Sequence, residues 1–284
     1  MKSRPPQRIA SHEVFIGRLV FGHEVAFAAQ TADGAERYQY SADDEYHEGD
    51  EEVTGLIGPN GAGKTTLINC ISGLDHPTGG RIVFDGHDIT RRLPHMVTRL
   101  GIARTYQNIR LFGEMTALEN LLVSQHALGK ATVVGALAFT PGYRREERFL
   151  RDNAMLLLDR FGLAPVADVQ ARTLPYGDQR RLELARALAT KPKLLLLDEP
   201  TAGMNPVETH DLGAQIIRLR EEGLTVLVIE HDMSLIQQVC DEIDVLNFGQ
   251  IIAHGTHDEI RQNRQVIEAY LGEDEGETHG TGAA

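Results

Sequence analysis

An α/β fold is predicted by three features of this 284-residue chain. Residues 53–57 are mostly apolar with a β-branched bias, a glycine-rich loop follows, and residues 66–72 carry apolar side chains at helical spacing. Residues 194–197 are a continuous apolar run, which is typical of a strand buried on both faces of a parallel sheet, and residues 224–229 are predicted to form another buried strand. Helix-like segments lie between the later strands, and this alternation favours a parallel sheet covered by helices.

The loop between the first of these strands and its helix matches the phosphate-binding pattern G-x-x-x-x-G-K-[ST]. Its residues, with the second threonine, are Gly58, Pro59, Asn60, Gly61, Ala62, Gly63, Lys64, Thr65 and Thr66. Glycines let the backbone bring its N–H groups against phosphate oxygens, and the next helix points its positive end at the anion. Lys64 is placed to reach the β and γ phosphates, and the Thr65 hydroxyl to bind Mg²⁺. An ordinary glycine-rich turn is disfavoured by the further motifs below.

The composition indicates a globular, acidic protein. The net charge of −13 and the isoelectric point of about 5.4 argue against a general nucleic-acid binder. Cys70 and Cys240 lie on apolar helix faces, so we expect small buried thiols rather than a disulfide framework. No apolar run approaches the roughly 18–20 residues of a membrane span, and no signal-peptide core is present. We therefore expect a cytosolic protein that reaches a membrane only through a partner.

The first half of the chain gives strands, turns and a mostly helical middle. Residues 14–21 and 25–29 are candidate strands, and the acidic residues 43–52 are interpreted as a solvated loop. Residues 81–84 and 101–106 are predicted strands, and residues 94–100 a short helix. From residue 108 to 172 the character is helical. Thr116 and Glu119 form a capping-box pattern, residues 147–161 a helix, and residues 130–142 a flexible loop.

The last third supplies the remaining helices and a hairpin. Helices are predicted over residues 180–190, 207–221 and 234–240. Residues 245–248 and 251–254 flank Gly249 and indicate a hairpin, and the acidic, glycine-rich residues 273–284 indicate disorder.

Two carboxylates end the strand at residues 194–197. Asp198 and Glu199 fall at the carboxyl edge of the sheet, where open α/β sheets bind their ligands. Asp198 is suited to hold Mg²⁺ through water, and Glu199 to polarise an attacking water as general base. In isolation, a strand end with two solvated acids would be the favoured interpretation. The phosphate-binding loop in the same chain favours a nucleotide-binding site instead.

The order of these motifs resembles the ATP-binding cassette (ABC) ATPases. The phosphate-binding loop is followed by Gln107, by the Leu-Pro-Tyr-Gly-Asp stretch at residues 174–178, by the paired carboxylates and by His231. More narrowly, residues 101–112, 229–233 and 266–272 are similar to the ATP-binding subunits of branched-chain amino acid importers.

The resemblance implies a P-loop cassette with a RecA-like core, an antiparallel β layer and a helical subdomain. Residues 53–272 would form the ATPase domain, with its helical subdomain at about 108–178, and residues 1–52 would belong to a divergent part of the β layer. Residues 273–284 would be a disordered acidic tail.

The resemblance also implies roles for single residues. Gln107 would lie in the loop that joins core and helical subdomain, contact Mg²⁺ or water, and signal the nucleotide state. His231 would sense the γ-phosphate by a hydrogen bond. Gly177 would face the γ-phosphate bound by a second cassette, and residues 201–205 would form the dimer-contact loop. Two ATP molecules would then lie between two cassettes.

The sequence departs from the family pattern in two places. Pro175 replaces a usual serine and Asp178 a usual glutamine, so a phosphate hydrogen bond is lost and a carboxylate would repel phosphate unless it turned away. Residues 1–52 match the expected β layer poorly and are either divergent or a reading-frame product. Tyr38, Tyr40 and Phe27 are the candidates for the aromatic side chain that stacks on adenine.

These implications lead to one main hypothesis and two alternatives. The chain is expected to bind and hydrolyse ATP with Mg²⁺ in an import system, pairing with an identical or related cassette on the inner face of the plasma membrane. Its partners would be transmembrane permease subunits and, indirectly, a solute-binding protein, with branched-chain amino acids as the best substrate and other amino acids, amides or urea as alternatives.

A soluble ATPase acting on DNA or ribosomes would need a long coiled coil or two cassettes, and a regulatory cassette would lose Lys64, Glu199 or His231. The sequence has neither of the first two features and retains all three residues.

Overall fold

The computed structural model describes residues 18–21, 25–28, 52–126 and 141–274. Most of the acidic loop predicted at residues 43–52 and most of the tail predicted at 273–284 lie outside these ranges. Glu273 and Asp274 are an exception, because they end a helix rather than begin a disordered tail.

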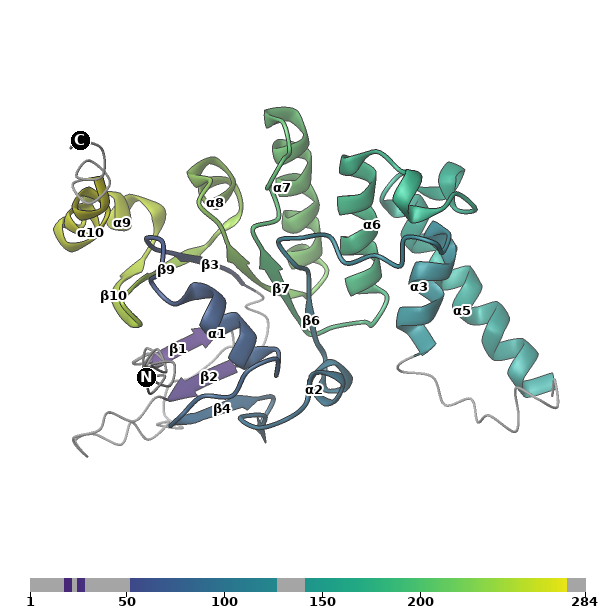
Figure 1. Ribbon diagram of the computed structural model, residues 1–284, viewed down its shortest axis with the longest axis horizontal. Helices are drawn as coiled ribbons and strands as arrows, with labels where there is room; N and C mark the ends of the chain where they lie inside the picture. The colour runs from purple at the N-terminus through teal and green to yellow at the C-terminus, as the bar shows by residue number, and fades with distance from the viewer. Residues whose placement is uncertain (1–17, 22–24, 29–51, 127–140, 275–284) are drawn as a thin grey trace, which may run out of the picture.

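A six-stranded sheet forms the centre of the fold (Figure 1), in the spatial order β10-β9-β3-β8-β7-β6. Its strands are β3 (Val53–Ile57), β6 (Ile102–Arg104), β7 (Leu194–Asp198), β8 (Thr225–Ile229), β9 (Glu242–Asn247) and β10 (Gln250–Gly255). All of these strands except β10 run parallel. Strand β10 pairs with β9 as the antiparallel arm of the predicted hairpin. Every residue of β3, β7 and β8 is buried, as their apolar runs predict.

A second, antiparallel sheet has the order β1-β2-β4-β5. It consists of β1 (Arg18–Phe21), β2 (Val25–Ala28), β4 (Arg81–Phe84) and β5 (His87–Asp88). Residue 25 on β2 pairs with residue 84 on β4. The N-terminal segment thus lies beside a strand that comes after the phosphate-binding loop in the chain. The antiparallel layer expected from the resemblance is therefore present in the described residues.

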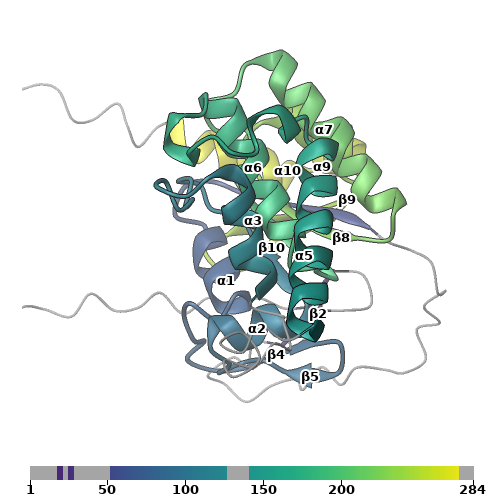
Figure 2. The ribbon, with the colours of Figure 1, turned by 90° about the vertical axis from the view of Figure 1, so that its right-hand side faces the viewer.

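Helices cover both faces of the central sheet. They are α1 (Lys64–Ile71), α2 (Pro94–Leu100), α3 (Ala117–His126), α5 (Pro141–Arg160), α6 (Tyr176–Leu188), α7 (Pro206–Glu221), α8 (Met233–Val239), α9 (His257–Gln262) and α10 (Arg264–Asp274), with short 3-10 turns at Ala164–Val166 and Ala171–Thr173. Helices α3 and α5 lie side by side in Figures 1 and 2 and project away from the small sheet. Helix α6 connects this helical arm to the central sheet.

Local signals placed most helix ends correctly, with two corrections. The capping box at the start of α3 is confirmed, because Thr116 N donates to Glu119 (2.8 Å) and Glu119 N donates to Thr116 Oγ1 (3.1 Å). Most of the flexible loop predicted over residues 130–142 lies outside the described residues. Its last two residues were predicted wrongly, since Pro141 opens α5; proline suits a first helical position because it lacks an N–H. The helix predicted from residue 180 begins at Tyr176, directly after Pro175.

Alternate residues of β7 separate two apolar clusters, one on each face of the sheet. Leu195 and Leu197 pack toward α6 and α7, whereas Leu194 and Leu196 pack toward α1 and the small sheet. Both cysteines are free thiols, and burial raises the pKa of Cys70 to about 11 and that of Cys240 to about 12. None of the helices in the described ranges has the length and apolar character of a membrane span.

Candidate functional site

The glycine-rich loop between β3 and α1 depends on backbone conformations that side chains disfavour. Gly58, Gly61 and Gly63 have φ values of 149°, 75° and 106°. A Cβ atom on Gly58 would lie 2.0 Å from the carbonyl oxygen of Leu246 on β9, so no larger residue fits. The hairpin that follows β9 also contacts the loop, because Gly249 N donates to Ala62 O at 2.7 Å. The loop conformation is thus fixed by glycine and by its neighbouring strand.

Lys64 is the first residue of α1 and is only 7% exposed. Its ammonium donates to the carbonyl oxygens of Gly58 and, at 2.9 Å, of Pro59. The cap residue of α1 is Gly63, which has no side chain to bind the first N–H groups, and Thr65 and Thr66 are exposed beside it. The loop therefore combines a lysine ammonium with a helix N-terminus, the arrangement that binds phosphate.

Asp198, at the end of β7, forms a buried ion pair that the sequence did not suggest. Its Oδ2 accepts from Arg104 at 2.7 Å, and the two side chains are 9% and 6% exposed. Arg104 also donates to Asn69 Oδ1 at 2.7 Å and to Ser72 Oγ at 3.0 Å, so it connects the carboxylate to α1. This network holds Asp198 beside α1, the helix that begins with Lys64.

Glu199 contacts two other predicted site residues, Gln107 and His231. Gln107 Nε2 donates to one carboxylate oxygen, and His231 Nε2 lies 3.1 Å from the other. Glu199 has a φ of 47°, an uncommon value for a residue with a side chain. The parallel strands β3, β7 and β8 end at one edge of the sheet, and the loops after them bring Lys64, Glu199 and His231 to that edge.

The segment after Glu199 is held by a buried carboxylate. Glu230 is 3% exposed, and its Oε1 accepts from Thr201 N at 2.8 Å and from the Thr201 hydroxyl. Its Oε2 accepts from His231 N at 2.8 Å. Glu230 thus joins the loop at residues 201–205 to the loop that carries His231. The sequence analysis placed Glu230 only within the run at residues 229–233 and predicted no role for it.

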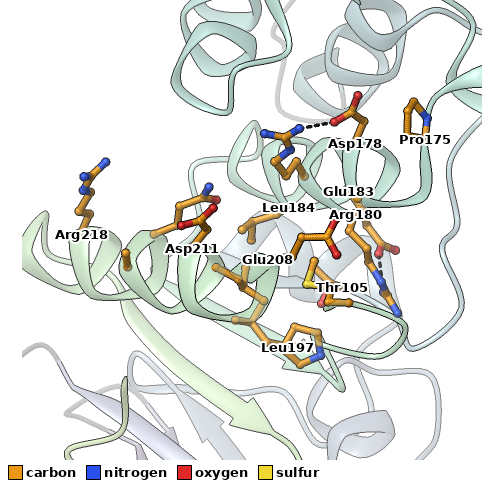
Figure 3. Close-up of a pocket in the computed structure, with 17 residues that line it drawn as sticks. Thr105, Pro175, Asp178, Arg180, Glu183, Leu184, Leu197, Glu208, Asp211 and Arg218 are labelled. Carbon is orange, nitrogen blue, oxygen red and sulfur yellow. Dashed lines mark hydrogen bonds and ion pairs between the residues drawn. The ribbon is translucent and has the colours of Figure 1, made fainter. Parts of the chain in front are cut away.

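Gly177 lies away from this cluster, on the first turn of α6. A Cβ atom there would lie 2.9 Å from Glu208 Oε1 at the start of α7. Figure 3 shows Pro175 and Asp178 in the same cavity, of about 480 Å³, between α6 and α7. Asp178 pairs with Arg181 one turn later, as the dashed line marks (Figure 3), so its negative charge is compensated within the helix.

Arg180 and Glu183 are further residues that the sequence analysis missed. They form an ion pair of 3.1 Å on α6, with side chains only 4% and 1% exposed. Both bind the backbone around Gln107. Burial raises the pKa of the Glu183 carboxyl above its ordinary value, against the lowering effects of the Arg110 amide and of Arg180. An arginine and a glutamate three residues apart normally indicate an exposed helical pair, so no sequence signal marked them.

Of the candidates for adenine stacking, Tyr38 and Tyr40 lie outside the described residues, and Phe27 belongs to β2.

Comparison with known proteins gives consistent matches. The family profile "ABC transporter" matches residues 47–202, and the profile "Branched-chain amino acid ATP-binding cassette transporter" matches residues 250–276. The high-affinity branched-chain amino acid transport ATP-binding protein BraF of Pseudomonas aeruginosa is 50% identical over 225 residues, which are 79% of this chain and 88% of BraF. LivG of Escherichia coli K12, with the same description, is 48% identical over 78% of this chain and 88% of LivG.

Solved structures give the same result. The ADP conformation of MJ1267, an ATP-binding cassette of an ABC transporter, superposes with a TM-score of 0.67 at 35% identity and covers 78% of this chain and 88% of its own. The dimeric post-hydrolysis state of the cassette MJ0796, bound to ADP and Pi, gives a TM-score of 0.61 at 26% identity over 72% of this chain and 85% of its own.

Proposed function

Because the chain belongs to the ABC transporter family, we propose that it is the ATP-binding and ATP-hydrolysing subunit of an importer for branched-chain amino acids. The observation that carries this proposal is the convergence of Gln107 and His231 on Glu199, at the sheet edge that also holds Lys64. A carboxylate held there by two side chains is placed to act on a water beside a bound nucleotide. The names of BraF and LivG support the substrate class.

We assign the phosphate-binding role to residues 58–66. The loop N–H groups and the N-terminus of α1 bind the phosphate chain, and Lys64 exchanges its present carbonyl partners for phosphate oxygens. Glu199 serves as general base, and His231 donates a hydrogen bond to the γ-phosphate. Because the His231 side chain is 43% exposed, it can reach a ligand while it contacts Glu199.

Three oxygen donors suit Mg²⁺, which prefers hard oxygen ligands and retains part of its water shell. The Thr65 hydroxyl is exposed at the start of α1, and Asp198 presents a carboxylate from β7. Gln107 uses its amide nitrogen on Glu199, which leaves the amide oxygen as the cation ligand. Bound Mg²⁺ neutralises phosphate charge during hydrolysis. The Asp198–Arg104 pair leaves one carboxylate oxygen for a water of that ion.

The proposal includes a second cassette, identical or related, whose Gly177 completes the nucleotide site of this chain. Transmembrane permease subunits dock on the helical arm and hold the pair at the inner face of the plasma membrane, with a solute-binding protein on the far side. In this arrangement residues 53–272 are the ATPase domain, about 108–178 its helical subdomain, and residues 1–52 part of the β layer.

Hydrolysis tests the first part of the proposal. We expect the purified chain to hydrolyse ATP only with Mg²⁺, and Glu199→Gln to lower kcat by about 100-fold or more, the range of general-base catalysis. A Glu199→Gln variant with unchanged kcat would refute the assignment. For the substrate, vesicles that contain the chain with its permease should take up labelled leucine in an ATP-dependent way; uptake of urea or an amide alone would show that the substrate class is different.

A further inference from the structure

Helix α6 carries a buried ion pair whose hydrogen bonds reach the main chain around Gln107 and not the side chains of the proposed nucleotide site. Arg180 and Glu183 lie on the face of α6 that packs toward the backbone at residues 106–110. With side chains 4% and 1% exposed, the pair has lost nearly all its water. A buried pair of this kind costs desolvation energy, so each partner needs strong hydrogen bonds in return.

Those hydrogen bonds go to the main chain on both sides of Gln107. Arg180 Nη1 donates to Tyr106 O at 2.7 Å, and Arg180 Nη2 donates to Gln107 O. Glu183 Oε1 accepts from Tyr106 N at 3.4 Å and from Arg110 N at 3.3 Å. Residues 105–110 form no helix or strand, so these contacts take the place of regular backbone pairing.

The same helix reaches the loop on the other side of Glu199. Tyr176 Oη donates to Ala202 O at 2.7 Å, and a Cβ atom on Gly203 would lie 3.0 Å from the Tyr176 ring. Gly177 follows Tyr176 on the first turn of α6. One rigid element therefore carries Gly177, holds the backbone of Gln107, and contacts the loop that follows Glu199.

We propose that Arg180 and Glu183 are positioning residues: they hold Gln107 on Glu199 and couple that contact to the orientation of Gly177. The inference rests on the proposed function, because it concerns the rate at which Glu199 acts. Rotation of α6 would pull the carbonyl groups of Tyr106 and Gln107 with it and withdraw the Gln107 amide from the carboxylate. Displacement of a catalytic group by about 1 Å can lower a rate by about 100-fold.

A double-mutant cycle separates this role from simple support of the fold. We would measure kcat and KM for ATP in the wild type, Arg180→Lys, Gln107→Ala and the double variant. Lysine keeps the charge but cannot donate to two carbonyl groups in a fork. We expect Arg180→Lys to lower kcat about tenfold with KM changed less than about threefold, and to have little further effect once Gln107 is alanine.

Arg160→Lys is the matched control, because Arg160 forms an ion pair with Glu222 at the surface, with side chains 33% and 56% exposed. It should leave kcat within about twofold. If Arg180→Lys does not fold, Glu183→Gln enters the cycle in its place, since it removes the charge with little change in shape. Additive losses in the cycle, or an unchanged kcat in both α6 variants, would overturn the inference.

Amide hydrogen exchange distinguishes failure of the inference from failure of the proposed function, because it needs no activity. We expect Arg180→Lys, unlike Arg160→Lys, to raise exchange at residues 106–110 by about tenfold. Unchanged exchange there would overturn the inference even if the chain hydrolyses ATP. A chain without ATPase activity that shows the raised exchange would contradict the proposed function and leave the positioning contacts supported.

Discussion

The phosphate-binding loop and the first half of α6 are held in place by different kinds of interaction. The loop is built from backbone conformations, with glycine required at residue 58, where a Cβ would lie 2.0 Å from Leu246 O. The first half of α6 is built from side chains that bind groups 73 to 77 positions earlier in the chain. The glycine and lysine pattern of the first region is visible in the sequence, whereas the contacts of the second join residues far apart in the chain and are visible only in the folded structure.

This difference explains how the second region tolerates change. Pro175 and Asp178 depart from the family pattern, yet α6 still begins at Tyr176 and Asp178 is compensated by Arg181. What holds the region in place is the set of contacts made by Tyr176, Arg180 and Glu183. We therefore expect changes in the loop to abolish nucleotide binding, whereas changes on α6 should affect rate more than binding.

The largest effect is expected for Gly58→Ala. The substitution combines a positive φ with a steric clash against backbone, so we expect ATP affinity to fall by at least about 100-fold. Fluorescent ATP-analogue binding would measure the loss. Gly79→Ala is the control, because a Cβ there meets no atom within 4 Å and φ is ordinary. Equal losses in both variants would contradict the requirement for glycine at residue 58.

Arg104→Ala should mainly destabilise the fold. It leaves the Asp198 carboxylate buried without its partner, which costs about 3–5 kcal/mol in the free energy of unfolding. Denaturant titration would measure this cost. Arg264→Ala breaks an exposed ion pair with Glu268 and should change the free energy by less than about 1 kcal/mol. A loss below about 1 kcal/mol for Arg104→Ala would show that Asp198 is solvated in solution.

Gly177→Ala should separate activity from stability. Alanine is a better helix former than glycine by about 1 kcal/mol, and its Cβ would meet only the carboxylate end of Glu208, whose other oxygen accepts from Asn205 N at 2.9 Å. We expect Tm to stay constant or rise while kcat falls about tenfold or more, because Gly177 is proposed to face the phosphate bound by a second cassette. Unchanged turnover would contradict that role.

The smallest effect is expected for Asp178→Asn. The Asp178–Arg181 pair is partly exposed, so its loss should change the free energy of unfolding by less than about 1 kcal/mol and kcat by less than about threefold. A tenfold gain in turnover would mean instead that the carboxylate faces phosphate in the working enzyme.

The sequence predicted the central sheet and the nucleotide residues because their signals are local. Glycine and lysine at fixed spacing identify the loop, and the apolar run before Asp198 identifies β7. Arg104, Arg180 and Glu230 escaped prediction because each acts through residues distant in sequence. The true start of α6 was missed for a different reason, since Pro175 and Gly177 weaken the helical pattern where the tertiary contacts of Tyr176 restore it.

The most direct test of the account is the ATP-dependent dimerisation of Glu199→Gln, measured by size-exclusion chromatography with and without Mg-ATP. Removal of the proposed general base should trap the ATP-bound pair, in which each Gly177 is proposed to complete the site of the other chain. The account predicts a monomer without ATP and a dimer with it, and loss of that shift when Gly177→Ala is added. A Glu199→Gln chain that binds ATP yet stays monomeric at saturating concentration would contradict pairing between identical cassettes and leave a related cassette as the partner.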